Sequence, residues 1–389
     1  MEILYSVANL KVLERLGEGS FGRVFRVQLK ADDEEDDPAS SSSGTSQFAC
    51  KVFDGDVESN LHEIVQEISI MQTLRNAMDP FYSSVGLVNI HGFHLGLTPK
   101  DPVSFITMDL CMGDSLSHLL QLRTSLSEAE AALVLSAIAR GLLFCHQQAR
   151  ILHRDVKPAN ILFAEEGCFD TARLADFGLA VHMTERFDVF YGPPGEGSRA
   201  FMAPEAEEDG QYSPASDVWG LGAVLFCMLV GKNPVRPRGS CEVQFEKAGD
   251  AWTSLSSHVC NLIKGMLCPE PHLRLTLLQV LQHPWTMSHV EHDQLQPYST
   301  SKVSCSPAFN NVQRTSNAAP HCPPGFNKRT ISVPTMLSSF VDLSLQAVDS
   351  PELSGTDMER PSLPAPAINL NVGSARVKVP SSAALLACR

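Results

Sequence analysis

The stretch His153-Arg154-Asp155-Val156-Lys157-Pro158-Ala159-Asn160, followed 16 residues later by Asp176-Phe177-Gly178, decides the fold of this chain. It brings together a carboxylate that can act as a base, a lysine that can contact phosphate and two oxygen-bearing side chains that can ligate a metal. Between the two parts, apolar residues at 161–163 and 173–175 flank a turn near Glu166-Gly167. This spacing predicts a short hairpin that returns Asp176 beside Asn160.

Length and composition set broad bounds on the protein. With 389 residues, the chain can form one large two-lobed unit or two ordinary domains. Its net charge of −14 argues against a nucleic-acid partner, because a phosphate backbone is held mainly by surplus Lys and Arg. The eleven cysteines contain no CxxC pair, which favours reduced thiols and a cytoplasmic or nuclear location. No signal peptide and no stretch of about 18 apolar residues stands out, so we expect no membrane span.

Composition divides the chain near residue 290. Residues 1–289 are periodic and apolar enough to fold, whereas residues 290–389 are rich in Ser, Pro, Ala and Asn and have few aromatics. Such a tail cannot bury enough apolar surface to offset chain entropy, so we expect it to be disordered. Within the folded part, the acidic run Asp32–Asp37 and the serines that follow predict a loop over 31–46. This loop is a solvated insertion or, alternatively, a docking or phosphorylation segment.

A glycine-rich segment precedes this loop: Leu16-Gly17-Glu18-Gly19-Ser20-Phe21-Gly22-Arg23-Val24. Dinucleotide-binding folds use the same GxGxxG pattern between a strand and a helix. Here, apolar and polar residues alternate from Phe25 to Leu29, which predicts a strand after the glycines. A strand-loop-strand arrangement without Cβ atoms allows main-chain N–H groups to close over nucleotide phosphates.

These motifs together resemble the eukaryotic protein kinase family, of the serine/threonine type, and the resemblance extends through residue 288. It implies an α+β bilobal fold with a β-rich N-lobe over about 1–108, a hinge at 109–113 and a mainly helical C-lobe over about 114–289. It also implies ATP and Mg²⁺ as cofactors, and transfer of the γ-phosphoryl group to Ser or Thr hydroxyls of protein substrates. The alternative is a pseudokinase or scaffold that keeps the fold and binds partners through its tail.

The resemblance implies a lysine-glutamate pair in the N-lobe. Lys51, in the strand 48–53, matches the family's lysine that faces the α- and β-phosphates, and it needs a carboxylate partner. Glu67 is the expected partner, since it flanks a helical apolar stripe formed by Ile64, Ile68, Met71 and Leu74. Glu63, one helical turn earlier, is the competing candidate.

The same comparison implies the purine site. Met108 is the expected gatekeeper, and the backbone of Asp109 and Cys111 would hydrogen-bond adenine. Apolar surface from Val24, Ala49 and Leu162 would enclose the ring. The full set of implied ATP-binding residues is Leu16, Gly17, Glu18, Gly19, Ser20, Phe21, Gly22, Arg23, Val24, Ala49, Lys51, Met108, Asp109, Cys111 and Leu162.

In the second lobe, the resemblance assigns the chemistry. Asp155 would accept the proton of the substrate hydroxyl and orient it, and Lys157 would neutralise charge on the transferred phosphoryl group. Lysine at this position is typical of serine/threonine kinases. Asn160 and Asp176 would supply oxygen ligands for Mg²⁺, a hard ion that favours them. As structural supports, we expect Asp217 to brace this loop and Arg274 to pair with Glu205.

Regulatory residues depart from the family pattern. Arg154 marks kinases in which a bound phosphate orders the activation segment. Where many relatives carry the phosphorylated Thr, this chain has Pro194. Our hypothesis is that Glu196 supplies the negative charge instead. Ser198 replaces the family's threonine that contacts Asp155 and Lys157. Tyr191 and Thr184 are weaker phosphorylation candidates.

Two further expectations concern partners. Ala159 and Cys227 occupy positions where basophilic relatives commonly have Glu, so we expect no dominant selection for Arg, although Asp114 could contribute. In the tail, the segment 329–334 resembles a site for a phosphoserine-binding adaptor at Ser332, but chance matches in such sequence are common. Residues 337–348 could form a docking or autoinhibitory helix, or remain disordered.

Overall fold

The computed structural model describes residues 10–19, 22–29, 46–53, 57–78, 86–96, 103–183, 188–237 and 240–290. The chain separates into two units, Met1–Ser306 and Pro307–Arg389, and every described residue belongs to the first. Four expectations lie outside the described residues: the acidic loop up to residue 45, Ser20 and Phe21 of the glycine-rich loop, Thr184, and the tail beyond Val290 with Ser332.

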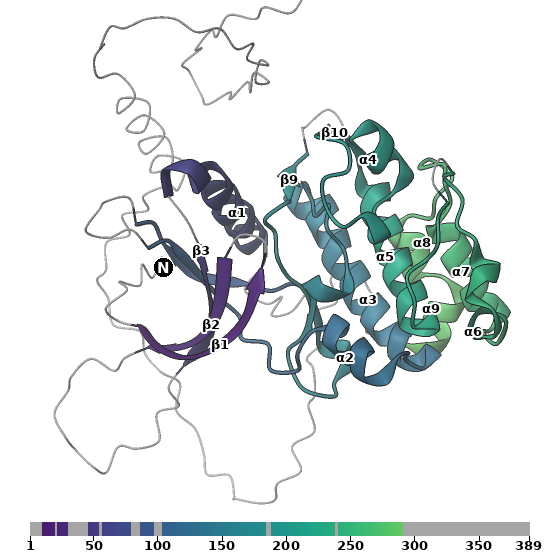
Figure 1. Cartoon of the computed structure of the whole chain (residues 1–389), viewed down its shortest axis with the longest axis horizontal. Helices are drawn as coiled ribbons and strands as arrows, with labels where there is room; N and C mark the ends of the chain where they lie inside the picture. Colours follow the sequence, from purple (N-terminus) through teal and green to yellow (C-terminus); the bar gives the residue numbers. More distant parts are fainter. Residues whose placement is uncertain are drawn as a thin grey trace, which may run out of the picture. The chain divides into compact units, whose positions relative to one another are not determined.

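The N-lobe is a five-stranded antiparallel sheet with the order β1-β2-β3-β5-β4 and one long helix, α1 (Figure 1). Its elements are β1 (Leu10–Gly19), β2 (Gly22–Leu29), β3 (Gln47–Phe53), α1 (Val57–Ala77), β4 (Ile90–His94) and β5 (Phe105–Met108). The strand predicted after the glycines is therefore present as β2. The apolar stripe of α1 is buried and joins the main hydrophobic core, so the helix is fixed against the rest of the fold.

The C-lobe is mainly helical, as expected (Figure 1). Its helices are α2 (Leu116–Arg123), α3 (Glu128–Phe144), α4 (Pro204–Asp209), α5 (Pro214–Val230), α6 (Asp250–Thr253), α7 (Ser257–Met266), α8 (Leu277–Leu281) and α9 (Pro284–His289). Short strands pair antiparallel beside them: β6 (Ile151–Leu152) with β9 (Val181–His182), β7 (Ile161–Phe163) with β8 (Ala172–Leu174), and β10 (Phe190–Tyr191) with β11 (Gln211–Tyr212). The bilobal α+β architecture is thus confirmed.

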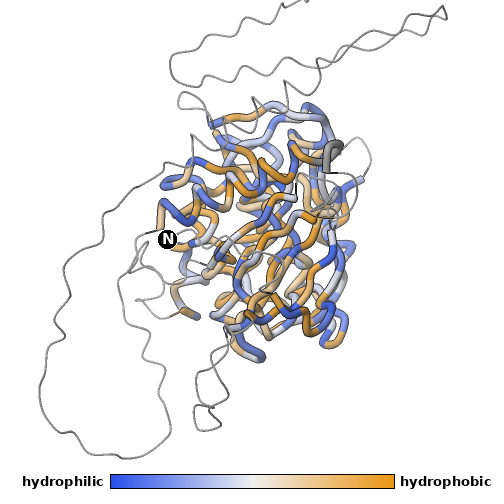
Figure 2. Tube along the Cα trace, turned by 90° about the vertical axis from the view of Figure 1, so that its left-hand side faces the viewer, coloured by the Kyte–Doolittle hydropathy of each residue, from blue (hydrophilic) through white to orange (hydrophobic). Residues whose placement is uncertain are grey.

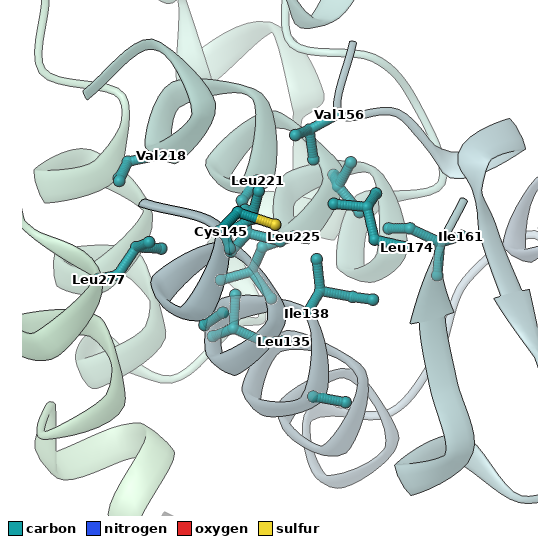
Figure 3. Close-up of a cluster of buried hydrophobic side chains, with 14 of the residues drawn as sticks. Leu135, Ile138, Cys145, Val156, Ile161, Leu174, Val218, Leu221, Leu225 and Leu277 are labelled. Carbon is teal, nitrogen blue, oxygen red and sulfur yellow. The ribbon is translucent and has the colours of Figure 1, made fainter. Parts of the chain in front are cut away.

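Two apolar helices, α3 and α5, form the centre of the C-lobe. Ser127 caps α3 through a capping box with Glu130, as its sequence predicts. The helix α5 begins at Pro214, where Ser213 caps it together with Ser216. Their buried side chains interlock (Figure 3), and hydrophobic stretches run through the interior of the folded part (Figure 2).

One helical segment, Glu128–Ala149, is long and apolar enough to cross a membrane by length and composition, although we expected no such stretch. It consists of α3 and a following π-helical turn, Cys145–Ala149. Because 78% of its most apolar window is buried inside the fold, the segment has the surroundings of a core helix and is weak support for a span.

A glycine sets the connection between the lobes just before β4. Gly86 has φ +75°, and its carbonyl accepts a 2.8 Å hydrogen bond from the amide of Leu174 in β8. A Cβ atom on Gly86 would lie 2.1 Å from the carbonyl oxygen of Ala137 in α3. The segment therefore requires glycine both for its backbone conformation and for its close approach to α3.

We predict that Gly86→Ala lowers the free energy of unfolding by about 2–5 kcal/mol, because left-handed strain and overpacking add together. Gly167→Ala is the matched control. Gly167 has a similar φ of +73° but no neighbouring atom within 4 Å of the added Cβ, so it should lose only about 1–2 kcal/mol. Urea denaturation of both variants measures the difference, and equal losses would contradict the packing argument.

Candidate active site

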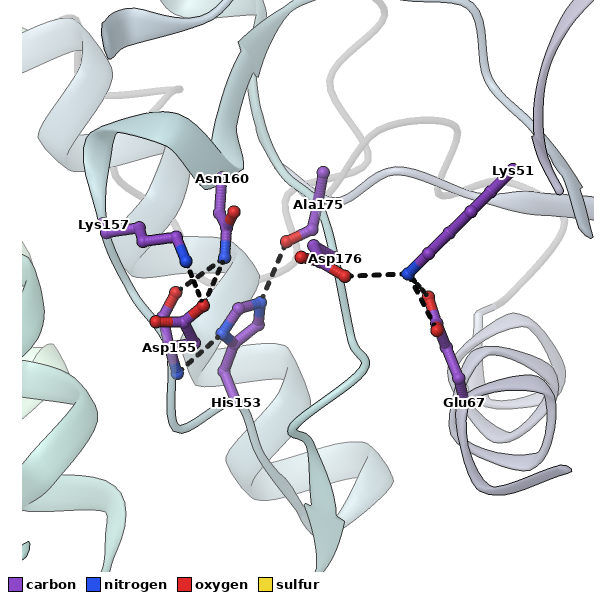
Figure 4. A network of polar contacts seen from close by, with 8 residues as sticks. All are labelled: Lys51, Glu67, His153, Asp155, Lys157, Asn160, Ala175 and Asp176. Carbon is purple, nitrogen blue, oxygen red and sulfur yellow. Dashed lines mark hydrogen bonds and ion pairs between the residues drawn. The ribbon is translucent and has the colours of Figure 1, made fainter. Parts of the chain in front are cut away.

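A buried ion pair joins β3 to α1. Lys51 Nζ lies 2.7 and 2.9 Å from the two carboxylate oxygens of Glu67 and 3.0 Å from Asp176 Oδ1 (Figure 4). The side chains of Lys51 and Glu67 are only 6% and 3% exposed. The structure brings Lys51 to Glu67 and leaves Glu63 exposed, so the geometry selects between the two candidate partners.

Burial and charge compete in this cluster. Burial raises the pKa of Glu67 by more than the Lys51 charge lowers it. Burial lowers the pKa of Lys51, but Glu67 and Asp176 together reverse this and hold the pKa above its ordinary value. For Asp176, burial raises the pKa, and the charge and hydrogen bond of Lys51 outweigh it, so the pKa is lowered. Asp176 is therefore an ionised carboxylate at neutral pH.

In the loop 153–160, one oxygen of Asp155 is held and the other is left free. Lys157 Nζ lies 2.5 Å from Asp155 Oδ2, and Asn160 Nδ2 donates to the same oxygen at 3.1 Å and to the Asp155 carbonyl at 2.9 Å. The amide of Asp155 donates to His153 Nδ1 at 3.3 Å. Asp155 Oδ1 is buried and has no hydrogen-bond partner among the described residues. An unsatisfied buried acceptor in an oriented carboxylate is suited to receive a hydroxyl group.

Asp217 of α5 holds this loop in place, as expected. Its carboxylate accepts hydrogen bonds from the amides of His153, at 3.0 Å, and Arg154, at 2.9 Å. His146 Nε2 lies 2.8 Å from the same carboxylate. Burial raises the pKa of Asp217, but the His146 hydrogen bond and charge, with further contributions from His153, outweigh it and lower the pKa. Sequence reasoning missed His146, which lies 71 residues from its partner.

The β7–β8 hairpin delivers Asp176 to the loop, as the spacing predicted. Ile161 pairs with Leu174, and the amide of Ala175 donates to the Asn160 carbonyl at 2.8 Å. Asp176 adopts φ +61°, and the fully buried Phe177 ring packs edge-on against His153 at a centroid distance of 5.0 Å. In Figure 4, Asp155 and Asn160 lie together, and Asp176 lies between this pair and Lys51.

A cavity of about 360 Å³ opens at this point. Its wall combines the loop, the segment after β8 and the segment before α4, through Asp155, Lys157, Asp176, Leu179, Glu196, Gly197 and Ser198. Ser198 therefore lies in the same cavity wall as Asp155 and Lys157. Leu179, which sequence reasoning missed, follows Asp176 closely and carries no chemical signal of its own.

The residues expected around a purine come from several strands. Val24 lies on β2, Ala49 on β3 opposite Met108 of β5, and Leu162 on β7. The amide of Asp109 donates to the Asn89 carbonyl at 3.0 Å, so this amide is not available to the purine that the sequence predicts here. Cys111 follows in the hinge and is half-buried.

Gly17 and Gly22, in the β1–β2 segment, lie in different surroundings. A Cβ on Gly17 would meet no atom within 4 Å, so its surroundings are open for a ligand. By contrast, a Cβ on Gly22 would lie 2.1 Å from the Val52 carbonyl oxygen, so Gly22 serves the close packing of β2 on β3. Leu16, Glu18, Gly19 and Arg23 are all placed on β1 and β2.

The donor set fits a hard metal ion that is shared with phosphates. Asn160 donates a hydrogen bond from Nδ2 to Asp155, so its amide oxygen remains available to a metal ion. Asp176 contacts Lys51 through Oδ1. Within the described ranges, no group of three His, Cys, Asp or Glu side chains has metal-binding geometry. An ion between Asn160 and Asp176 would complete its shell with phosphate and water oxygens, as Mg²⁺ commonly does.

The segment before α4 is tied to Arg154. Arg154 Nη2 lies 2.5 Å from Glu196 Oε2, and Arg154 Nη1 donates to the Leu179 carbonyl at 3.1 Å. The guanidinium stacks over the Tyr212 ring, 4.1 Å from its centroid, and the Tyr212 hydroxyl is shared between the carbonyls of Pro193, at 3.1 Å, and Glu196, at 3.2 Å. Tyr212 was missed because nothing local in the sequence connects β11 to Arg154. Tyr191 is 70% exposed.

Supports and selectivity positions lie around this centre. Arg274 donates to both oxygens of Glu205, at 2.7 and 3.0 Å, which is the expected pair. Asp114 is exposed and lies 2.9 Å from the His118 ring. Ala159 is exposed, and the buried Cys227 donates its thiol to Asn233. Neither Ala159 nor Cys227 offers a carboxylate to a basic peptide.

Comparison with known proteins agrees with this geometry. The sequence model of the family described as "Protein kinase domain" matches residues 10–286. The chain belongs to the protein kinase family. This kinase is 35% identical over 196 residues to "Calcium-dependent protein kinase 20" of Oryza sativa subsp. japonica, which covers 48% of this chain and 34% of that protein. It is also 28% identical to "Putative ribosomal protein S6 kinase alpha-2" of Caenorhabditis elegans. That alignment spans 323 residues and covers 77% of this chain. The kinase spans only 34% and 38% of the lengths of these two relatives.

We predict that Lys51→Met destabilises this kinase by roughly 3 kcal/mol near pH 8, because it leaves the Glu67 charge buried without its cation. The penalty should shrink toward pH 5. The pKa of Glu67 is already raised in the folded state, and it rises further without Lys51. Binding of a proton to Glu67 therefore stabilises the folded variant at low pH. This stabilisation is lost as pH rises through the folded-state pKa.

Urea denaturation at the two pH values measures this effect. The control is the double variant Lys51→Met/Glu67→Gln, which has no charge at position 67 and should show a smaller, flatter penalty. A Lys51→Met penalty that is equal at both pH values would refute the assignment of a buried Glu67 charge.

Proposed function

We propose that this kinase is an active serine/threonine protein kinase that transfers the γ-phosphoryl group of ATP to protein hydroxyls. One observation carries the proposal: Asp155, whose Oδ1 is buried and has no hydrogen-bond partner among the described residues, lines the same cavity as Lys157 and Asp176. Two carboxylates and an ammonium group thus line one space, which supports roles for them as proton acceptor, metal ligand and phosphate-binding cation. Similarity to two proteins named as protein kinases supports the same conclusion.

Each residue of the site would have a defined task in this reaction. Asp155 Oδ1 accepts the proton of the acceptor hydroxyl and orients its oxygen, while Lys157 and Asn160 keep the carboxylate from rotating. Lys157 also offers positive charge to the transferred phosphoryl group. Lys51, fixed by Glu67, faces the other phosphates. Because phosphoryl transfer demands little covalent chemistry from the protein, this positioning accounts for most of the catalysis.

The cofactor assignment follows from the same residues. Asn160 and Asp176 would hold Mg²⁺, which when bound neutralises phosphate charge and aligns the phosphates. The lowered pKa of Asp176, caused by Lys51 against the opposing effect of burial, keeps the carboxylate ionised for this purpose. The eight cysteines within the described ranges are free thiols, which supports the proposal of a reducing, cytoplasmic or nuclear location.

The competing function is a pseudokinase or scaffold. Such a protein has no need to keep a cation, a base and a metal-binding carboxylate in mutual register. Here Lys51, Asp155 and Asp176 are all present and are linked through direct hydrogen bonds and ion pairs. Nothing in the geometry of the described residues favours the scaffold.

We predict that Asp155→Asn lowers kcat by about 10²–10⁴-fold, because the amide orients the hydroxyl poorly and cannot accept its proton. ATP-dependent phosphorylation of a generic protein substrate, with wild type measured in parallel, gives the result. Asp250→Asn is the control, since Asp250 is exposed at the start of α6 and distant in sequence from the site. Equal activity of wild type and Asp155→Asn would overturn the assignment.

We also propose that Glu196 supplies the anion that orders the segment around Ser198. The Arg154 side chain is 5% exposed and needs a counter-charge, and Glu196 provides one without modification. The carbonyl of Glu196 is held at the same time by Tyr212. Since Glu196 and Ser198 both line the cavity, the ion pair can fix the cavity wall directly.

We predict that phosphate-free wild-type protein, verified by mass spectrometry, is active. Glu196→Gln should lower kcat/KM by about tenfold, because a neutral amide replaces one charge-assisted hydrogen bond to a nearly buried guanidinium. Glu166→Gln is the matched control, as Glu166 is exposed in the β7–β8 turn. If the unphosphorylated wild type stays inactive until an upstream kinase treats it, the built-in charge is insufficient and the proposal is wrong.

A further inference from the structure

Four hydrogen-bond donors converge on one carboxylate behind the hinge. Asp109 Oδ2 accepts from the amide of Asn89 at 3.1 Å, from its side-chain Nδ2 at 2.9 Å and from Arg173 Nη1 at 2.5 Å. On the other oxygen, His91 Nε2 lies 2.8 Å from Oδ1. These donors come from the segment before β4, from β4 itself and from β8. A carboxylate satisfied on both oxygens is fixed in position and orientation.

The main chain connects the same three parts. The amide of Asp109 donates to the Asn89 carbonyl, and the amide of Val88 donates to the Leu174 carbonyl, both at 3.0 Å. The segment 86–91 therefore lies between the hinge and β8. Arg173 precedes Leu174 on β8 and is opposite Leu162 of β7. The strand that supplies Arg173 is also the strand that leads to Asp176.

The charges of this cluster are complementary. The Asp109 side chain is 15% exposed and that of Arg173 is 21% exposed, so solvent screens their attraction only partly. Burial raises the pKa of Asp109, but the hydrogen bonds from His91 and Asn89 and the charges of Arg173 and His91 outweigh it, and the pKa is lowered. Asp109 is therefore an anion that bridges the N-lobe, through His91 and Asn89, to the C-lobe, through Arg173.

We infer that Asp109 and Arg173 form a positioning pair that fixes the hinge main chain for recognition of the nucleotide base. This inference rests on the proposed function for the identity of the nucleotide. The Asp109 amide is already engaged by Asn89, so rotation of this residue is blocked at the amide and at the side chain together. The carbonyl of Asp109 and the residues that follow are then held in one orientation before a ligand arrives. A preorganised hinge lowers the entropy lost on binding.

The pair acts on the base and not on the phosphates. Arg173 and Asp109 lie on the hinge side of β7–β8, whereas Lys51 and Asp176 carry the phosphate end. Loss of the pair should therefore weaken binding most for a nucleotide whose base the hinge recognises. ATP and GTP share their ribose and phosphates and differ only in the base, so their relative affinity reports on the hinge alone.

The test uses the full chain and displacement of a fluorescent ATP analogue by ATP and by GTP. Arg173→Met should weaken ATP binding by about three- to tenfold, change GTP binding less and so reduce the preference for ATP. Arg173→Lys, which keeps the charge, should recover much of the preference. The double variant Asp109→Asn/Arg173→Met removes both charges and leaves no unpaired ion. It should bind ATP no more weakly than Arg173→Met alone does. Arg123→Met, which breaks an exposed ion pair with Glu130 at the end of α2, is the control.

Turnover separates positioning from general damage. With Arg173→Met, KM for ATP should rise while kcat at saturating ATP stays within about twofold, since the contacts of Asp155 and Lys51 are unaltered. Unchanged ATP affinity in a variant with normal thermal melting, or equal weakening of ATP and GTP, would overturn the inference. If wild type binds ATP but phosphorylates no protein, the proposed function fails, and the displacement data alone still decide the role of the pair.

Discussion

The arrangement of this kinase depends on one physical requirement, which is to neutralise the nearly buried ammonium group of Lys51. A nearly buried cation is tolerated only when anions surround it, and here Glu67 and Asp176 do so from two different parts of the chain. The strand β3, the helix α1 and the segment after β8 must therefore be in place together. The apolar stripe of α1, which includes Ile68 and Met71, packs into the same core cluster as Leu174 of β8. Hydrophobic packing thus brings the carboxylates to the lysine, and the ion pairs hold the three segments in one arrangement.

Two further carboxylates, the buried Asp217 and the partly buried Asp109, extend this principle. Asp217 joins α5 to the amides of His153 and Arg154, and Asp109 joins the hinge to β4 and β8. Each one links segments that are far apart in sequence, and each accepts several hydrogen bonds that hold down its pKa against the effect of burial. Pairs of this kind contribute little net stability, because desolvation offsets their attraction. Their effect is to fix geometry, which is what phosphoryl transfer requires.

Sequence reasoning succeeded where the signal was local. The helical stripe around Glu67, the alternation in β2 and the spacing of the β7–β8 hairpin each follow from residues within a few positions of one another. It failed where the partner was distant and the family resemblance did not supply it, as it had for Arg274 with Glu205. His146 reaches Asp217 across 71 residues, and Arg173 reaches Asp109 across 64, with no periodicity to announce either contact. The packing reason for Gly22 was missed for a similar reason, since the carbonyl of Val52 that excludes a Cβ lies on the neighbouring strand. Tertiary packing sets these positions, and local pattern cannot reveal it.

The geometry around Arg154 bears on how completely a carboxylate can replace a phosphate. Glu196 engages Nη2, the Leu179 carbonyl engages Nη1, and Nε is buried without a partner among the described residues. A phosphate group would bring three acceptor oxygens and a larger charge, enough for Nε as well. A single carboxylate therefore neutralises the guanidinium but leaves one donor unsatisfied. The Tyr212 ring beneath Arg154, with its hydroxyl on the Glu196 carbonyl, compensates by fixing both members of the pair from the α5 side. In this segment a weaker anion than phosphate is combined with a second support from Tyr212, and this combination is what the proposed activity without prior modification requires.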